Sequence, residues 1–255
     1  MTPLDALLLG VVEGVTEFLP ISSTGHLILT SSLLHIADSE FLKTFEIAIQ
    51  LGAILAVVAL YWRSLLNIEI LKRVIIGFIP TGVIGLALYK VVKTYLLGSE
   101  VVVLWALALG GLALIAFELW HSESENAASD ITEITYRQAV LVGLFQALAI
   151  IPGVSRSAAT ILGGLFVGIK RAAIVQFSFL LAVPTMVSAT GLDLIKNTGL
   201  FSSDQALLLG IGFVTSFFVA LAAIKFLLSF VKSHSFVSFG VYRILVACLF
   251  FWLVF

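Results

Sequence analysis

Two carboxylates, Glu13 and Glu17, lie four residues apart within an apolar stretch near the N-terminus. Residues four apart on a helix share one face, so both carboxylates can contact the same ligand. Ionisable side chains within apolar segments are costly to bury and are functional candidates by default. The pair can hold a divalent cation, or one carboxyl can stay protonated while the other acts as a base. The alternative is that both side chains simply reach interfacial water.

A cluster of three hydroxyls and one imidazole follows the carboxylates: Ser22, Ser23, Thr24 and His26. One of these hydroxyls can be explained as the cap of the next helix. Capping does not explain three hydroxyls together with a histidine and two glutamates. A serine activated by a neighbouring base is a nucleophile arrangement, so the cluster is a candidate for bond cleavage.

Arg156 is an isolated basic residue in a second apolar region, and Ser155 and Ser157 flank it. A guanidinium, hydroxyls and the free N–H groups of a following helix together make a phosphate-binding site. Thr160 lies one helical turn later and is expected to face the same site. The alternative is an ion pair between Arg156 and the Glu13–Glu17 pair that holds two parts of the chain together.

The composition of the chain indicates that these residues are positioned inside a membrane. Of 255 residues, 60% are hydrophobic and 11% are charged, and the mean hydropathy is +1.16. An ordinary soluble domain carries about 25% charged residues, so this chain cannot cover a water-facing surface. A bilayer supplies the apolar solvent that it needs. The net charge of −1 leaves no basic face for nucleic acid.

Eight apolar regions follow one another along the chain. Six are long enough to span a bilayer as single helices, at residues 44–62, 74–92, 101–120, 172–194, 206–230 and 238–255. The other two, 4–34 and 138–168, are broken near the middle by Pro, Gly, Ser and a charge. A helix, a break and a second short helix predict a re-entrant hairpin, with a kinked spanning helix as the alternative.

The two broken regions resemble each other. Residues 10–13 match residues 143–146 at an offset of 133, and residues 21–24 match residues 154–157 at the same offset. A further resemblance joins the segment that begins at Gly77 to the one that begins at Gly212. These matches indicate an internal repeat, with chance similarity of apolar segments as the alternative.

Each predicted repeat, about 1–120 and 137–255, holds one hairpin and three spans, and a polar linker at 121–136 joins them. Because three is odd, the second repeat must begin on the opposite side of the membrane, which gives an inverted-topology repeat. We therefore predict one all-α integral membrane domain over residues 1–255. It has six transmembrane helices and two re-entrant helical hairpins that enter from opposite faces.

The distribution of lysine and arginine predicts the orientation. With the N-terminus outside, nine basic residues lie at cytoplasmic ends and four at outer ends, as the positive-inside rule requires. The nine are Arg63, Lys72, Arg73, Arg137, Lys170, Arg171, Lys225, Lys232 and Arg243.

The two polar segments resemble the signatures of a known family. Residues 13–26, EGVTEFLPISSTGH, are similar to the first signature of the undecaprenyl-pyrophosphate phosphatases, also called bacitracin-resistance proteins. Residues 152–160, PGVSRSAAT, are similar to the second. The resemblance extends over essentially the whole chain.

This resemblance implies an enzyme that hydrolyses undecaprenyl pyrophosphate to undecaprenyl phosphate and inorganic phosphate. The reaction recycles the lipid carrier for peptidoglycan synthesis and confers bacitracin resistance. The resemblance also implies a bacterial cytoplasmic (inner) membrane protein, a polyprenyl pyrophosphate lipid as substrate, and a divalent cation, Mg²⁺ or Ca²⁺. The site is expected to open toward the outer, periplasmic face.

By similarity, the functional positions are Glu13, Glu17, Ser23, His26 and Arg156. We expect the two glutamates to bind the metal and Arg156 to bind the pyrophosphate. Ser23, or a metal-bound water, would attack the terminal phosphorus, and His26 or Glu17 would manage the proton.

The remaining hydroxyls of the two motifs, Ser22, Thr24, Ser155, Ser157 and Thr160, are expected to contact the substrate. A transporter or flippase of phosphorylated lipid that uses the same inverted-repeat site is the alternative function. The sequence leaves the oligomeric state open, and a homodimer is one of the assemblies to consider.

Overall fold

The computed structural model describes residues 1–96, 99–196 and 203–254, which are almost entirely helical. The α-helices in chain order are α1 (Pro3–Thr16), α2 (Ser23–Leu33), α3 (Glu40–Leu66), α4 (Ile68–Val91), α5 (Glu100–Trp120), α6 (Tyr136–Ala147), α7 (Arg156–Phe166), α8 (Arg171–Lys196), α9 (Ser203–Phe230) and α10 (Val237–Val254). Short turns of other helix types lie at Val92–Leu96 (η1), Ile131–Glu133 (η2) and Leu148–Ile150 (η3).

The prediction of an all-α, multi-pass membrane protein is confirmed. Within the described ranges, five helices are long and apolar enough to cross a bilayer: α3, α4, α5, α8 and α9. The sixth predicted span, 238–255, ends beyond the described residues, and α10 falls in the class of shorter apolar helices. The six-span count therefore stays a prediction.

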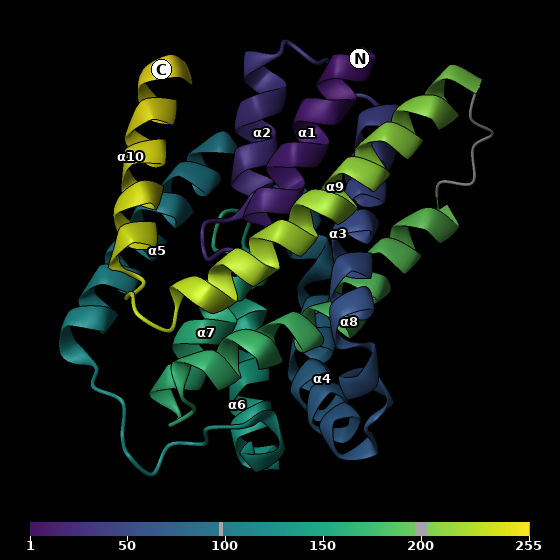
Figure 1. Cartoon of the computed structure of the whole chain (residues 1–255). Helices are drawn as coiled ribbons and strands as arrows, with labels where there is room; N and C mark the ends of the chain where they lie inside the picture. The colour runs from purple at the N-terminus through teal and green to yellow at the C-terminus, as the bar shows by residue number, and fades with distance from the viewer. Residues whose placement is uncertain (97–98, 197–202, 255) are drawn as a thin grey trace.

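Both broken regions are helix–break–helix units, and their breaks lie in the predicted segments. Residues 17–22 separate α1 from α2, and residues 148–155 separate α6 from α7. In Figure 1 the α1–α2 unit begins at the end of the molecule that holds both termini, and α6 begins at the opposite end. This is the arrangement that inverted hairpins require, although re-entry into a bilayer stays a prediction.

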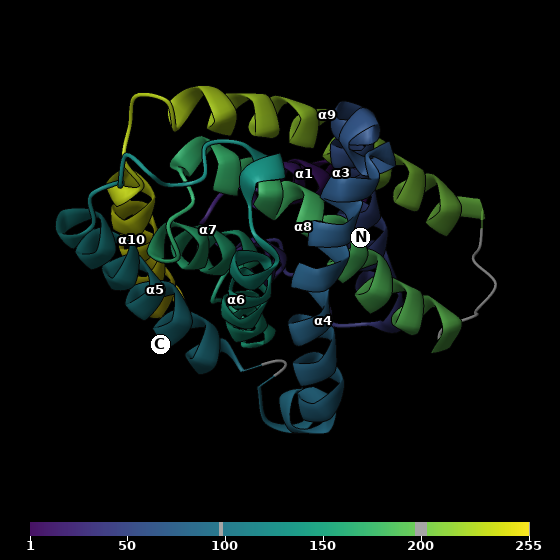
Figure 2. The same cartoon turned by 90° about the horizontal axis from the view of Figure 1, so that it is seen from below.

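The long helices surround the two broken units. Helix α1 packs along α9, α6 packs along α4, and α5 packs along α10. Figure 2 shows α6 and α7 enclosed between α5 and α10 on one side and α3, α4 and α8 on the other. The breaks are thereby surrounded by protein, which is the condition for non-helical backbone at membrane depth.

Pairs of glycines bring each broken unit against the other half of the chain. A Cβ atom on Gly10 of α1 would meet the carbonyl oxygen of Gly212 of α9 at 2.8 Å. A Cβ atom on Gly143 of α6 would likewise collide with the carbonyl oxygen of Gly77 of α4. Gly10 and Gly143 are matched positions of the proposed repeat, and so are Gly77 and Gly212. The repeat remains a proposal, and this reciprocal packing supports it.

Arg243 was counted among the basic residues at cytoplasmic ends, but its side chain lies in the interior of the protein. Arg243 lies within α10 and is fully buried. Its guanidinium carries five N–H groups, and each one donates to a backbone carbonyl. The acceptors are Leu107, Pro20, Val154, Ala106 and Gly153. Pro20 belongs to the first break, and Gly153 and Val154 belong to the second. The count of basic residues treats such a charge as marking the end of a span, but here its side chain joins the two breaks.

Candidate active site

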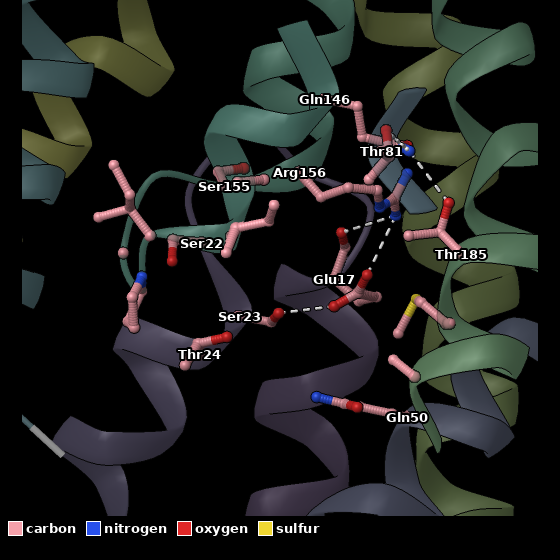
Figure 3. Close-up of a pocket in the computed structure, with 17 residues that line it drawn as sticks. Glu17, Ser22, Ser23, Thr24, Gln50, Thr81, Gln146, Ser155, Arg156 and Thr185 are labelled. Carbon is pink, nitrogen blue, oxygen red and sulfur yellow. Dashed lines mark hydrogen bonds and ion pairs between the residues drawn. The ribbon is translucent and has the colours of Figure 1, made fainter. Parts of the chain in front are cut away.

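A cavity of about 200 Å³ lies where the two breaks meet. Its polar wall consists of Glu17, Ser22, Ser23, Thr24, Gln50, Thr81, Gln146, Ser155, Arg156 and Thr185. Apolar residues such as Ile150, Ile151 and Met186 complete it. Figure 3 shows Ser23 and Arg156 on opposite sides of Glu17. Side chains that are more than 130 residues apart in the sequence therefore share one small polar space.

Two helices begin at this cavity, and each begins with a serine in an unusual conformation. Ser22 and Ser155 both have φ of 74°. The Ser22 hydroxyl accepts a hydrogen bond from the Gly25 N–H, and the Ser155 hydroxyl accepts one from the Ala158 N–H. These bonds cap α2 and α7 and leave other N–H groups of the first turns free. Helix N-termini that converge in this way favour an anionic ligand.

Glu17 links the two halves of the site. The Ser23 hydroxyl donates to Glu17 Oε2 at 2.6 Å, and Arg156 Nη2 donates to Glu17 Oε1 at 3.0 Å. All three side chains are buried or nearly so. The ion pair between Arg156 and the carboxylate pair, the alternative considered from sequence, is therefore present and is made with Glu17. It is compatible with a substrate site, because both partners also line the cavity.

The guanidinium of Arg156 is held on its other side as well. Its Nη1 donates to the Ser178 carbonyl at 2.8 Å, and Ser178 in turn shares a hydrogen bond with Thr160. The guanidinium lies over the ring of Phe18, with its Cζ 5.7 Å from the ring centroid. Within the described residues the Nε–H is buried and has no partner. One strong donor is thus left for a ligand.

Four of the predicted site residues do not line the cavity: Glu13, His26, Ser157 and Thr160. The Ser157 hydroxyl donates to the Leu19 carbonyl at 2.7 Å, which fastens the start of α7 to the first break. Thr160 bonds Ser178, behind Arg156. Their contacts place both residues in support of the cavity wall.

Both ring nitrogens of His26 have partners. Nδ1 lies 2.7 Å from the Ser22 carbonyl, and Nε2 lies 2.9 Å from the Tyr242 hydroxyl. A carbonyl can only accept, so Nδ1 carries the hydrogen and Nε2 of the neutral ring accepts from Tyr242. In this arrangement His26 orients the turn at Ser22 and stacks on Tyr242.

The family of the chain follows from comparison with known proteins. Residues 6–249 match the family model described as bacitracin resistance protein BacA. The chain belongs to the BacA family. Curated proteins similar to it include the undecaprenyl-diphosphatase of Aquifex aeolicus (strain VF5), which is 52% identical over 247 residues, 96% of each chain.

A second relative in the BacA comparison, the undecaprenyl-diphosphatase of Sulfurihydrogenibium sp. (strain YO3AOP1), is 51% identical over 251 residues. That alignment covers 98% of this chain and 99% of the relative. The protein of the same name from Persephonella marina (strain DSM 14350 / EX-H1) is 50% identical over 97% of each chain. The family resemblance read from the two motifs is confirmed.

The carboxylate oxygens of Glu13 and Glu17 are ligands that suit a hard divalent cation. Glu13 is fully buried, and neither of its carboxylate oxygens has a hydrogen-bond partner within the described residues. A buried carboxylate in that state needs a proton or a cation. The described residues contain no group of three or more acidic, His or Cys side chains placed to hold a metal ion, so Glu13 and Glu17 are the carboxylates offered to a cation here. Mg²⁺ is commonly held this way, by one or two carboxylates with substrate phosphates and water.

Several residues at the BacA site were missed by the sequence analysis. Thr81 and Thr185 each follow a proline within a long apolar helix, at Pro80 and Pro184. The Pro-Thr pair that the two helices share could have identified both threonines as candidate site residues. Arg243 was visible as a charge within an apolar run. Ser178 had no signal beyond one hydroxyl among apolar neighbours, because only the fold brings it to Arg156.

Proposed function

We propose that this chain hydrolyses undecaprenyl pyrophosphate to undecaprenyl phosphate and inorganic phosphate. The relatives that match along their full length carry the name undecaprenyl-diphosphatase. The observation that supports this activity best is the Ser23–Glu17–Arg156 chain of hydrogen bonds in a cavity that favours an anion. It joins a hydroxyl nucleophile, a base and a phosphate-binding cation in one place.

The first step is binding of the pyrophosphate. Arg156 and the N-terminal turns of α2 and α7 supply positive charge and N–H donors to the terminal phosphoryl group. Ser22, Thr24 and Ser155 add hydroxyls from the same wall. Ser178 and Phe18 hold the guanidinium in place before substrate arrives, so little reorganisation is needed as negative charge develops.

The second step is attack on the terminal phosphorus. Ser23 Oγ bonds to phosphorus while its proton passes to Glu17 Oε2, which already accepts that hydrogen at 2.6 Å. The anhydride P–O bond breaks, and undecaprenyl phosphate leaves with the electron pair. Water then hydrolyses the phosphoserine and releases inorganic phosphate. A direct attack by water, with Glu17 as its base, uses the same residues and is the alternative.

Glu13 and Glu17 are the residues that would hold a divalent cation, Mg²⁺ or Ca²⁺. Such a cation neutralises phosphate charge in the transition state.

The substrate is an amphiphile, and the cavity has walls for both of its parts. Ile150, Ile151 and Met186 line it beside the polar residues, so a prenyl chain can leave the headgroup along an apolar wall. We propose that the protein lies in the bacterial cytoplasmic membrane with this site open to the outer face. Eight basic residues remain at predicted cytoplasmic ends once Arg243 is removed from the nine.

The deciding experiment measures phosphate release from farnesyl or undecaprenyl pyrophosphate by the purified protein in detergent, with and without a chelator. We expect release that requires a divalent cation and falls at least about 100-fold in Arg156→Ala. Arg63→Ala removes an exposed arginine near the end of α3 and serves as control. Full activity of Arg156→Ala would contradict the site assignment.

The opposed α1–α2 and α6–α7 units also suit a carrier of phosphorylated lipid. Transfer of a fluorescent prenyl phosphate across liposomes without phosphate release would favour this second function. Phosphate release without transfer would favour the first.

A further inference from the structure

Gln146 is a buried amide at the end of α6, and its contacts fix which way it faces. The Thr81 hydroxyl donates to the Gly143 carbonyl at 2.7 Å, and the Thr185 hydroxyl donates to the Leu181 carbonyl at 2.7 Å. A hydroxyl has one hydrogen, so both threonines can only accept from Gln146. The amide nitrogen must therefore face them.

The observed bonds agree with that requirement. Gln146 Nε2 donates to Thr81 Oγ1 at 2.9 Å and to Thr185 Oγ1 at 3.0 Å, as the dashed lines of Figure 3 show. Both hydrogens of the amide are used. The oxygen Oε1 is buried and has no partner within the described residues. A buried acceptor without a donor is costly unless a ligand or water supplies one.

An unsatisfied donor belongs to the same cavity. Gln146 and Arg156 both line it, and Arg156 Nε is buried without a partner in the described part of the chain. An occupant that satisfies both groups must accept one hydrogen bond and donate another. A fully ionised phosphoryl group can accept from Arg156, but it would set a charged oxygen against the Gln146 carbonyl. A phosphoryl group with one P–OH satisfies both.

We propose that Gln146 is a specificity-determining residue that recognises the monoprotonated form of the terminal phosphoryl group through its P–OH. This rests on the proposed function for the identity of the ligand. The threonine pair gives the amide its fixed direction, and Arg156 binds the ionised oxygens of the same group. Phosphate monoesters take up their second proton with a pKa of about 6, so this form is available near neutral pH.

The charged side chains around the cavity do not explain a preference for the monoprotonated phosphoryl group. In the described ranges, the charged residues that line it are Glu17 and Arg156. Glu17 already accepts from Ser23 and Arg156. From α4 and α8 the wall receives Thr81, Thr185 and uncharged neighbours, and from α3 it receives Gln50. Glu13 is buried on α1 and Glu46 is half-buried on α3, and neither lines the cavity.

The first test measures binding of inorganic phosphate by calorimetry at about pH 5.5 and about pH 8, on either side of the phosphate titration. We expect the ratio of affinities at the two pH values to be about tenfold larger in wild type than in Gln146→Leu, because one hydrogen bond depends on the P–OH. Gln138→Leu, on the same helix, removes bonds to Val167 and Gly168 outside the cavity and serves as control. Its ratio should equal that of wild type.

The second test uses Gln146→Glu and the pyrophosphatase assay. A protonated carboxyl can donate to a threonine and present its carbonyl to the cavity, as the amide does. Ionised, it repels the phosphate. At about pH 5.5 we expect the kcat/KM of Gln146→Glu to be close to that of wild type at the same pH. At about pH 8 we expect it to be at least about 100-fold below that of wild type at the same pH.

A ratio in Gln146→Leu within twofold of wild type would overturn the proposal. So would an equal loss at both pH values in the two variants, since that would indicate a bound water or simple packing. The binding test involves no hydrolysis. If wild type binds phosphate with the expected pH dependence but releases none from prenyl pyrophosphates, the proposed function fails and the role of Gln146 stands.

Discussion

Ser22 and Ser155 have the same backbone conformation, φ 74° with ψ of 97° and 113°, although 133 residues separate them. Each ends a break, caps the helix that follows and lines the cavity. Left-handed φ values cost a non-glycine residue about 1–2 kcal/mol. The same strain occurs at both matched positions. It indicates that the site requires this turn geometry, which points the N-termini of α2 and α7 at one cavity.

Glycine should be a better replacement for Ser155 than alanine. Ser155→Ala loses the cap to Ala158 and keeps the strained φ, while Ser155→Gly loses the cap and relieves the strain. We expect the glycine variant to be the more stable of the two by about 1 kcal/mol. Thermal unfolding in detergent measures it. A more stable alanine variant would mean that this φ is not adopted.

Removing the Ser23 hydroxyl tests the nucleophile. Ser23→Ala should lower kcat by at least about 1,000-fold with little change in KM. The variant has no hydroxyl to attack phosphorus and no proton to pass to Glu17. Ser31→Ala is the matched control on the same helix, since the Ser31 hydroxyl is buried without a partner in the described residues. That change should leave kcat unaltered. Normal turnover by Ser23→Ala would assign the attack to water.

Arg156 should not be replaceable by lysine. A guanidinium reaches the Ser178 carbonyl and Glu17 at once, and a lysine ammonium is a point charge without that fork. Arg156→Lys should lower kcat/KM by about 100-fold. Arg171→Lys breaks a comparable fork to Glu118 outside the cavity, so its kcat/KM should stay within a few fold of wild type. Similar losses in both would point to stability rather than phosphate binding.

Arg243 should be essential for folding. Arg243→Leu would remove a donor from five backbone carbonyls, three of which, at Pro20, Gly153 and Val154, lie in the breaks outside the α-helices, and each unsatisfied group costs about 1–3 kcal/mol. We expect little folded protein from this variant by size-exclusion chromatography. Arg243→Lys keeps the charge with fewer donors and should fold with a lower midpoint of thermal unfolding. A stable, active leucine variant would contradict the role of Arg243 in joining the breaks.

The close contact at Gly143 predicts a large effect from one methyl group. Gly143→Ala places a Cβ against the Gly77 carbonyl oxygen, which is backbone and cannot move aside cheaply. We expect a loss of about 3 kcal/mol or more, of the order of other overpacking changes. Gly210→Ala in α9 meets nothing within 4 Å and should be neutral or stabilising. Equal midpoints of thermal unfolding for the two variants would refute the close packing of α4 on α6.

Much of this protein could be predicted from its sequence. Long apolar runs specify spanning helices because backbone groups in lipid must bond within their own segment. The Pro, Gly and Ser residues near Pro20 and Pro152 placed both breaks correctly, because proline cannot continue a helical hydrogen-bond ladder. The residue types of the two motifs indicated phosphate chemistry, and the family match agrees with that interpretation.

The tertiary structure alone decided which of those residues share one cavity and which support it. Glu17, Ser23 and Arg156 meet there, while His26 and Thr160 turn to Tyr242 and Ser178. Periodicity gives the face of a helix but not the neighbour that the face meets. For the same reason Arg243 was counted only as a charge at a cytoplasmic end, and Gln146 only as the residue matched to Glu13 in the repeat. Their partners are carbonyls and hydroxyls from distant helices, and only packing brings such common groups together.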